Sequence, residues 1–202
     1  VLAVVSGFSG AGKGTLMKAL LSEHADQYAL SISATTRGPR EGEVDGREYF
    51  FKTKDQFEQM IADDALVEYA EYVGNYYGTP KAYVEEQLAR GKDVIEIQGA
   101  LKVRRQFPDA LLLFVTPPSA EVLKNRLIGR GTETMDVIEH RLARALEEAE
   151  GLEEYDYLVV NDVLEEAVRE VHEIIQNEHY RVARNADKIR EMRNELKGFT
   201  RQ

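Results

Sequence analysis

Apolar and polar positions follow two alternating rhythms along most of the chain. Short apolar runs of strand length are followed by stretches in which apolar residues recur every three or four positions. This alternation is typical of a parallel sheet wrapped by helices, an α/β fold. We expect strands at about residues 2–6, 29–33, 93–98, 111–115 and 157–160. We expect helices at about residues 13–25, 80–90, 99–107, 118–129, 134–150 and 163–179.

A segment of different composition interrupts this alternation between about residues 34 and 80. The segment is rich in Gly, Tyr and charged residues, with strand-like pieces at residues 49–51 and 66–70. We therefore predict a small inserted β-rich lobe at residues 34–80, and a core formed by residues 1–33 and 81–202. The C-terminal segment from Asn177 to Arg201 carries Arg and Lys at helical spacing, which predicts a solvated amphipathic helix.

Composition narrows the class of protein. The chain has 202 residues, as expected for one domain or one core with insertions, and its net charge is −10. This acidic balance argues against nucleic acid or an anionic membrane as the main partner. The absence of cysteine excludes disulfides and thiol catalysis, and no apolar run approaches membrane-spanning length. We expect a cytoplasmic protein without a signal peptide, and because the chain begins at Val1 rather than Met, we expect residues to precede it.

A glycine-rich loop follows the first apolar run and precedes the first helical pattern. Such a loop can point several backbone N–H groups at a polyphosphate, and the following helix start adds partial positive charge. Lys13 would reach the outer phosphates. The pattern predicts the ATP-binding loop of a P-loop NTPase core, with the alternative that the glycines only join strand to helix. The candidate residues are Gly7, Ser9, Gly10, Ala11, Gly12, Lys13, Gly14 and Thr15.

Arginines gather in two further segments. Arg37 and Arg40 stand three apart around a Gly-Pro turn, where two guanidinium groups can hold one phosphate. Arg126 and Arg130 stand four apart at the end of a predicted helix, so they share one helical face. We assign Arg144 to an ordinary helix surface.

Two longer motifs resemble the guanylate kinases. The stretch Ser33–Gly46, with Thr35-Thr36-Arg37-Gly38-Pro39-Arg40, is similar to one of that family, and so is Gly74-Asn75-Tyr76-Tyr77-Gly78, which Thr79 follows. The resemblance covers nearly the whole chain. It implies a GMP-binding lobe in which Glu68 and Thr79 read the base. It also implies a set of residues that hold the GMP phosphate: Ser33, Arg37, Arg40, Tyr49 and Tyr77.

The base assignment also agrees with hydrogen-bond chemistry. Guanine offers two N–H donors that one carboxylate such as Glu68 can accept, and an oxygen that a hydroxyl such as Thr79 can contact. Adenine would leave that carboxylate facing a ring acceptor. Sites built on such pairing reject the wrong partner by about 10⁴-fold or more, because buried polar groups would go unpaired.

The same resemblance implies a helical lid at about residues 126–148, whose Arg126, Arg130 and Arg141 close over the ATP phosphates. In the family, the Asn161-Asp162 neighbourhood lies beside the adenine of ATP, although both residues can equally cap the next helix. Where many P-loops have a Ser or Thr for Mg²⁺, this chain has Gly14. The family's Mg²⁺ is held largely by substrate phosphates and water, so we expect no dedicated protein metal site.

One departure from the family concerns the strand before Gln98-Gly99. The family carries two acidic residues there, whereas this chain is about three residues shorter and keeps Glu96. Either the strand is short or residues are absent from the sequence. We place Glu96 near Mg²⁺ and GMP, and Asp93 in the preceding turn.

The resemblance implies transfer of the γ-phosphoryl group of ATP to GMP, giving ADP and GDP, with Mg²⁺ as cofactor. On this interpretation Lys13, Arg37, Arg130 and Arg141 are the catalytic residues. Two alternatives are a phosphotransferase with a different acceptor and a non-catalytic guanylate-kinase-like binding module. The intact phosphate loop argues against the module. The sequence indicates no oligomeric state.

Overall fold

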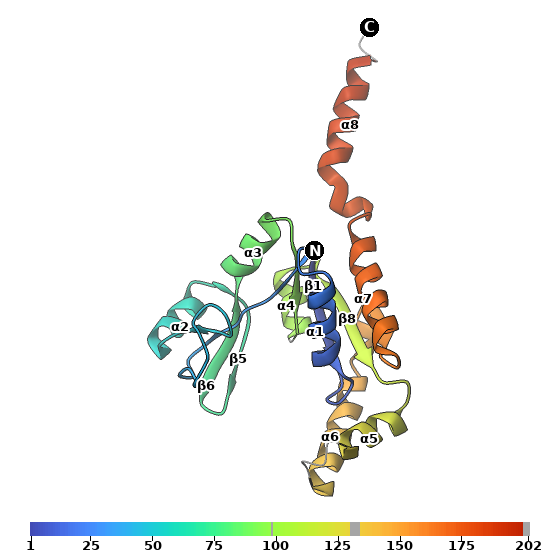
Figure 1. Cartoon of the computed structure of the whole chain (residues 1–202). Coiled ribbons are helices and arrows are strands. Elements are labelled where there is room, and N and C mark those ends of the chain that lie inside the picture. Colours follow the sequence, from blue (N-terminus) through green and yellow to red (C-terminus); the bar gives the residue numbers. More distant parts are fainter. Residues whose placement is uncertain (98, 130–133, 200–202) are drawn as a thin grey trace.

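A five-stranded parallel sheet forms the centre of the molecule, which a computed structural model describes at residues 1–97, 99–129 and 134–199 (Figure 1). Its order is β2-β7-β1-β8-β9, so the first strand of the chain lies in the middle. All four pairings between neighbouring strands are parallel. The strands are β1 (Leu2–Gly7), β2 (Tyr28–Leu30), β7 (Asp93–Glu96), β8 (Leu111–Thr116) and β9 (Tyr157–Val160).

Helices cover both faces of this sheet, as the alternation of the sequence predicts. Ala3 and Val5 of β1 face the cluster that contains α1 and α7 residues, whereas Leu2 and Val4 face the cluster that contains α3 and α4 residues. The two-residue period of a strand thus assigns its apolar side chains to two separate cores. These helices are α1 (Lys13–Glu23), α3 (Lys81–Ala89), α4 (Ala100–Gln106) and α7 (Leu164–Glu178).

The inserted segment forms a second sheet of four strands in the order β4-β3-β6-β5. The strands are β3 (Ala34–Thr35), β4 (Phe50–Phe51), β5 (Leu66–Tyr72) and β6 (Asn75–Pro80). The sequence analysis missed its helix α2 (Lys54–Ala62), which begins with a capping box between Thr53 and Gln56. Phe57 of α2 is buried with Ala34 and Leu66 in a small core of the lobe.

Two more helices, α5 (Ala120–Gly129) and α6 (Met135–Ala149), pack against one another in the predicted lid region. Leu123 and Leu127 of α5 share a buried cluster with Ile138 and Ala145 of α6. The fold class predicted from the sequence, an α/β P-loop core, is therefore confirmed.

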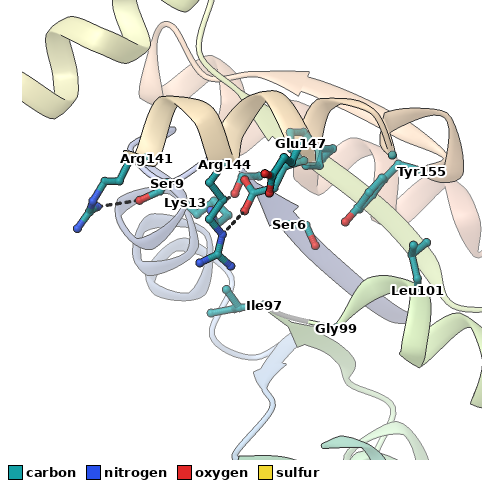
Figure 2. A pocket seen from close by; sticks show the side chains of 14 residues that line it. Ser6, Ser9, Lys13, Ile97, Gly99, Leu101, Arg141, Arg144, Glu147 and Tyr155 are labelled. Atoms are coloured by element: carbon teal, nitrogen blue, oxygen red, sulfur yellow. Dashed lines mark hydrogen bonds and ion pairs between the residues drawn. The ribbon is translucent and has the colours of Figure 1, made fainter. Parts of the chain in front are cut away.

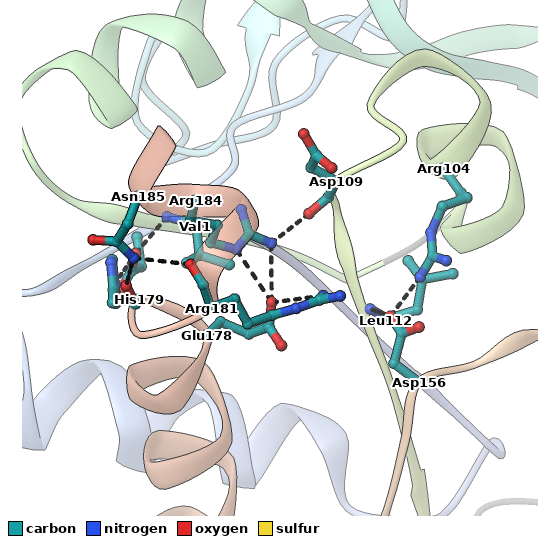
Figure 3. Close-up of polar contacts among 11 residues, drawn as sticks. Val1, Arg104, Asp109, Leu112, Asp156, Glu178, His179, Arg181, Arg184 and Asn185 are labelled. Carbon is teal, nitrogen blue, oxygen red and sulfur yellow. Dashed lines mark hydrogen bonds and ion pairs between the residues drawn. The ribbon is translucent and has the colours of Figure 1, made fainter. Parts of the chain in front are cut away.

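The chain ends in α8 (Ala186–Phe199), which projects away from the sheet and buries none of its side chains (Figure 1). The exposed helix predicted from Asn177 to Arg201 is therefore confirmed for Ala186–Phe199, whereas Asn177 and the buried Glu178 belong to α7. A turn of 3-10 helix (Val182–Asn185) joins α7 to α8. Figure 3 shows that Arg184 anchors this junction by donating to the Asp109 carbonyl and pairing with the buried Glu178 at 3.1 Å.

The placement of Asp93 in a turn was wrong. Asp93 is the first residue of β7, is buried, and pairs in register with Tyr28 of β2. Its carboxylate lies 2.9 Å from His179 Nε2 and accepts a hydrogen bond from Gln176 at 3.2 Å. These partners come from the end of α7, which short-range sequence patterns do not reveal. Among the described residues, no helix has the length and apolar character needed to cross a membrane.

Candidate active site

The phosphate loop connects β1 to α1 at the carboxyl end of the sheet. The Ala11 N–H donates to the Phe8 carbonyl at 3.0 Å, and Gly12 precedes the helix in a left-handed conformation. Lys13 opens α1 and donates to the carbonyls of Gly7 and, at 3.1 Å, Phe8. Burial lowers the pKa of Lys13, and the Glu148 carboxylate partly opposes that shift. The Lys13 side chain therefore folds back onto the carbonyls of its own loop.

The lid helices contact this loop region directly. Arg141 of α6 donates to Ser9 Oγ at 2.8 Å, as Figure 2 shows. Arg126 of α5 donates to the backbone carbonyl of Asn161 at 2.9 Å. The predicted lid arginine Arg130 lies outside the described residues. Two of the three predicted lid arginines therefore lie close to the loop or to its neighbour Asn161.

A cavity of about 790 Å³ opens between the phosphate loop, α4 and α6. Lys13, Ser9 and Arg141 line one side of it, while Glu147 and Tyr155 lie on another (Figure 2). Its dimensions and its cations suit a polyphosphate. Gly14 and Thr15, also predicted for ATP binding, are exposed in the first turn of α1.

A second cavity of about 780 Å³ lies between the lobe and the sheet. It is lined by most of the residues predicted for the acceptor: Ser33, Tyr49, Glu68, Tyr77 and Glu96. Ile97 and Arg144 line both cavities, so the two meet at these side chains. This arrangement can bring two phosphorylated ligands together at one wall.

Arg144, which the sequence analysis assigned to an ordinary helix surface, is exposed over 74% of its side chain and also lines both cavities. Figure 2 draws it among the side chains that line the first cavity, and its Nε donates to Glu148 at 3.2 Å. It stands one helical turn after Arg141 and therefore on the same side of α6. Only the tertiary structure reveals that this side faces the meeting point of the cavities.

Arg37, predicted to hold the GMP phosphate, lies beside Tyr49 of the second cavity and forms a two-point pair with Glu43. The Arg37 nitrogens lie 3.0 and 2.9 Å from the two Glu43 oxygens, and the guanidinium stacks over the Tyr49 ring at 5.3 Å. The hydrogen bond to Glu43 raises the pKa of Arg37 and lowers that of Glu43. Tyr49 and Tyr77 are in edge contact, 6.1 Å between centroids. The side chain of Arg40 is exposed on the same loop.

Two carboxylates and one hydroxyl of the residues predicted to bind GMP lie together: Glu68, Glu96 and Thr79. Thr79, 1% exposed, donates to Glu96 at 2.7 Å and lies 3.4 Å from a Glu68 oxygen. Burial, and secondarily the Glu96 charge, raises the pKa of Glu68 to about 7. A hydroxyl has a single proton. Thr79 therefore uses its proton on Glu96, and the raised pKa leaves Glu68 partly protonated near neutrality.

Gly99 makes this carboxylate arrangement possible. Its φ is +75°, a left-handed conformation, and a Cβ built there would lie 2.9 Å from Glu68 Cγ. The start of α4 thus approaches Glu68 as closely as only glycine permits. A larger residue would strain the backbone and displace Glu68.

Strand β7 has four residues and ends at Glu96, two residues before the end expected from the sequence. The last β1 residue paired with β7 is Val4, opposite Glu96, whereas β1 runs on to Gly7 beside β8. Glu96 is 5% exposed and sits deeper in the sheet than the phosphate loop. Its carboxylate accepts hydrogen bonds from the Thr79 hydroxyl and, at 2.8 Å, from the Ile97 N–H, and it lines the second cavity together with Glu68.

A central parallel sheet, a phosphate loop at the end of its middle strand and arginine-bearing lid helices define a P-loop enzyme of the nucleoside monophosphate kinase class. Sequence comparison makes the assignment narrower. The model of the guanylate kinase family matches residues 2–178, and the chain belongs to that family.

Several relatives support this assignment over the full chain. A guanylate kinase of Bacillus subtilis (strain 168) is 53% identical over 195 residues, covering 95% of this chain and 96% of the relative. One of Lactococcus lactis subsp. lactis (strain IL1403) is 50% identical over 200 residues, covering 98% and 97%. The crystal structure of guanylate kinase from Anaplasma phagocytophilum has a TM-score of 0.67 and 28% identity, covering 91% and 88%. The predicted family and enzyme class are confirmed, and the individual residue roles stay predictions.

Proposed function

We propose that the protein transfers the γ-phosphoryl group of ATP to the phosphate of GMP, giving ADP and GDP. The observation that carries this proposal is the meeting of the two cavities at Arg144 and Ile97. One cavity has the cations of a phosphate loop, and the other has carboxylates placed for a guanine base. Family membership supports both assignments.

The reaction needs no covalent enzyme intermediate. An oxygen of the GMP phosphate forms a bond to the γ-phosphorus as the bond to the β,γ-bridging oxygen breaks, and the electron pair leaves with ADP. The protein contributes position and charge, since phosphoryl transfer offers little else to catalyse. Lys13 and the loop N–H groups bind the donor, while Arg37, Arg40, Tyr49 and Tyr77 bind the acceptor phosphate.

The arginines of α6 stabilise the transferring group. Arg141 already reaches the phosphate loop through Ser9, and Arg144 faces both cavities. Their guanidinium groups compensate charge that spreads over the phosphoryl oxygens in the transition state. Closure of the lid and the lobe around both substrates would exclude water, which would otherwise accept the phosphoryl group.

Mg²⁺ would neutralise negative charge on the donor phosphate oxygens when bound. The described residues contain no group of three acidic, histidine or cysteine side chains placed to hold a metal ion. We therefore assign most of the metal ligands to nucleotide phosphates and water, which suits a cation that keeps several waters.

The test is ADP production from ATP and Mg²⁺ with GMP, AMP, CMP or UMP supplied separately. We expect strong turnover with GMP alone. Turnover with another acceptor would retain the phosphotransferase and contradict the guanine assignment. A folded protein that binds ATP but produces no ADP with any of the four acceptors would contradict the proposed reaction.

A further inference from the structure

Asn161 connects the end of the sheet to the phosphate loop. It follows β9, and its backbone N–H donates to the Thr116 carbonyl at 2.8 Å, which continues the pairing of β9 with β8. The residue is 6% exposed. Its side-chain Nδ2 donates to the carbonyl of Ala11 at 2.8 Å, across a sequence separation of 150 residues. A buried amide that contacts a loop backbone is fixed in its orientation.

This hydrogen bond determines which way one peptide group of the loop faces. In a planar trans peptide, the C=O of one residue and the N–H of the next point in opposite directions. Holding the Ala11 carbonyl toward Asn161 therefore turns the Gly12 N–H away from Asn161. A phosphate loop binds its ligand with such N–H groups, so each carbonyl must be turned out and satisfied elsewhere.

The contact is also tight in space. A Cβ built on Gly12 would lie 2.5 Å from Asn161 Nδ2, and the φ of Gly12 is +87°. Ala11 is fully buried beside it. The loop thus packs directly on the Asn161 amide, leaving no room for even one methyl group between them.

Asn161 also receives a contact from the lid. Arg126 of α5 donates to its backbone carbonyl at 2.9 Å. One residue therefore has its N–H tied to β8, its C=O tied to a lid helix and its side chain tied to the phosphate loop. This arrangement places Asn161 between the fixed sheet and the two parts of the donor site.

We propose that Asn161 is a positioning residue for the donor, which sets the phosphate loop in its binding conformation before ATP arrives. This inference rests on the proposed function only in taking the loop as the polyphosphate site. It differs from both roles that the sequence analysis allowed, a contact with adenine and a cap of the next helix. The cap is not seen, because the N-cap of α7 is Val163, without a side-chain hydrogen bond. An adenine contact affects only ligands with that base, whereas loop positioning affects every ligand with the polyphosphate.

The experiment compares MgATP with magnesium tripolyphosphate, which has no base, as ligands of the nucleotide-free enzyme measured without GMP. Asn161→Ala removes the donor, and Asn161→Leu removes it while filling nearly the same volume, so at least one variant should fold. Arg169→Ala, at an exposed position of α7, serves as the control. We expect both Asn161 variants to bind both ligands about tenfold more weakly, by the same factor, because a buried carbonyl loses its partner.

Hydrogen exchange gives a second readout without any ligand. We expect faster exchange of the amides of residues 8–13 in the Asn161 variants and unchanged exchange in the control. Weaker binding of MgATP alone, with tripolyphosphate binding and loop exchange unchanged, would overturn the proposal in favour of a base contact. Unchanged binding of both ligands would overturn it as well. These measurements contain no GMP. Their results can therefore be interpreted even if the protein does not transfer a phosphoryl group to GMP.

Discussion

We assign a phosphorylated ligand both to the phosphate loop and to the acceptor lobe. The two regions differ in the size of the hydrophobic core that supports them. The loop begins at the end of the middle strand of a five-stranded sheet, with fully buried apolar residues on both faces. The lobe has four strands around a hydrophobic cluster whose buried members are Ala34, Phe57 and Leu66, with partly buried side chains packed against them. The difference teaches that the donor site is fixed by the main core, whereas the acceptor site depends on a small separate one.

The charged side chains of the two regions also have different kinds of partners. Donor-side residues contact backbone carbonyls and a hydroxyl of the loop itself, as Lys13 and Arg141 do. On the acceptor side, Arg37 is held by the carboxylate of Glu43, and Glu68 and Glu96 share one hydroxyl. We therefore expect donor-side changes to affect every acceptor equally, and acceptor-side changes to affect one substrate selectively.

The largest expected effect is that of Lys13→Met. Removal of this cation should lower kcat/KM about 10³-fold, because electrostatic stabilisation of the transferring phosphoryl group is the main catalytic contribution. The loss should be equal for GMP and dGMP as acceptors. The measurement is a coupled ADP assay, with Lys18→Met on the exposed side of α1 as control. A loss below tenfold would contradict the role of Lys13.

Glu68→Gln should act selectively. Its amide would present a donor to one guanine N–H, so the preference for GMP over AMP in kcat/KM should fall about 10²-fold while the KM for ATP stays unchanged. Parallel initial-rate measurements with both acceptors test this. Glu85→Gln, exposed on α3, is the matched control. An unchanged preference would remove Glu68 from base recognition.

Phe57→Ala tests whether the lobe is supported separately. Phe57 is fully buried and stacks on Tyr76 with 5.2 Å between ring centroids. Truncation of such a residue typically lowers the free energy of unfolding by about 3–5 kcal/mol, and here the small core of the lobe would be destabilised. We expect the KM for GMP to rise about tenfold with ATP binding retained. Equal loss of both substrates would show that the lobe and the main core unfold as one unit.

The smallest expected effect is on pH dependence. The raised pKa of Glu68, about 7, means that the folded protein binds more protons than the unfolded chain between about pH 4.5 and 7. The free energy of unfolding should therefore fall as pH rises through this window. Guanine requires the ionised carboxylate, so the KM for GMP should rise a few-fold as pH falls below 7. Glu68→Gln should flatten both profiles, measured by thermal melts and initial rates. If the free energy of unfolding or the KM for GMP still depends on pH in this variant, that dependence comes from another titrating group.

The sequence predicts most of this architecture because its signals are local. The strand–loop–helix order of the phosphate loop and the arginine spacing need only neighbouring residues, and their elements lie where predicted. Asp93, Arg144 and the Ala11 contact of Asn161 depend instead on segments distant in the chain, which no local pattern encodes. Helix α2 is a different case, since its Thr53–Gln56 capping box was present in the sequence but lay within a segment interpreted as strands.

The internal contacts of the cations have a consequence for selectivity against small anions. Lys13, Arg37 and Arg141 each contact protein partners, so a phosphate that binds to them must displace a carbonyl, a carboxylate or a hydroxyl. A single inorganic phosphate or sulfate ion would displace one protein partner of a cation and form one new contact in its place. A nucleotide exchanges several partners at once and adds the contacts of its base and sugar. We therefore expect these cations to favour a ligand long enough to exchange several partners together over a single small anion.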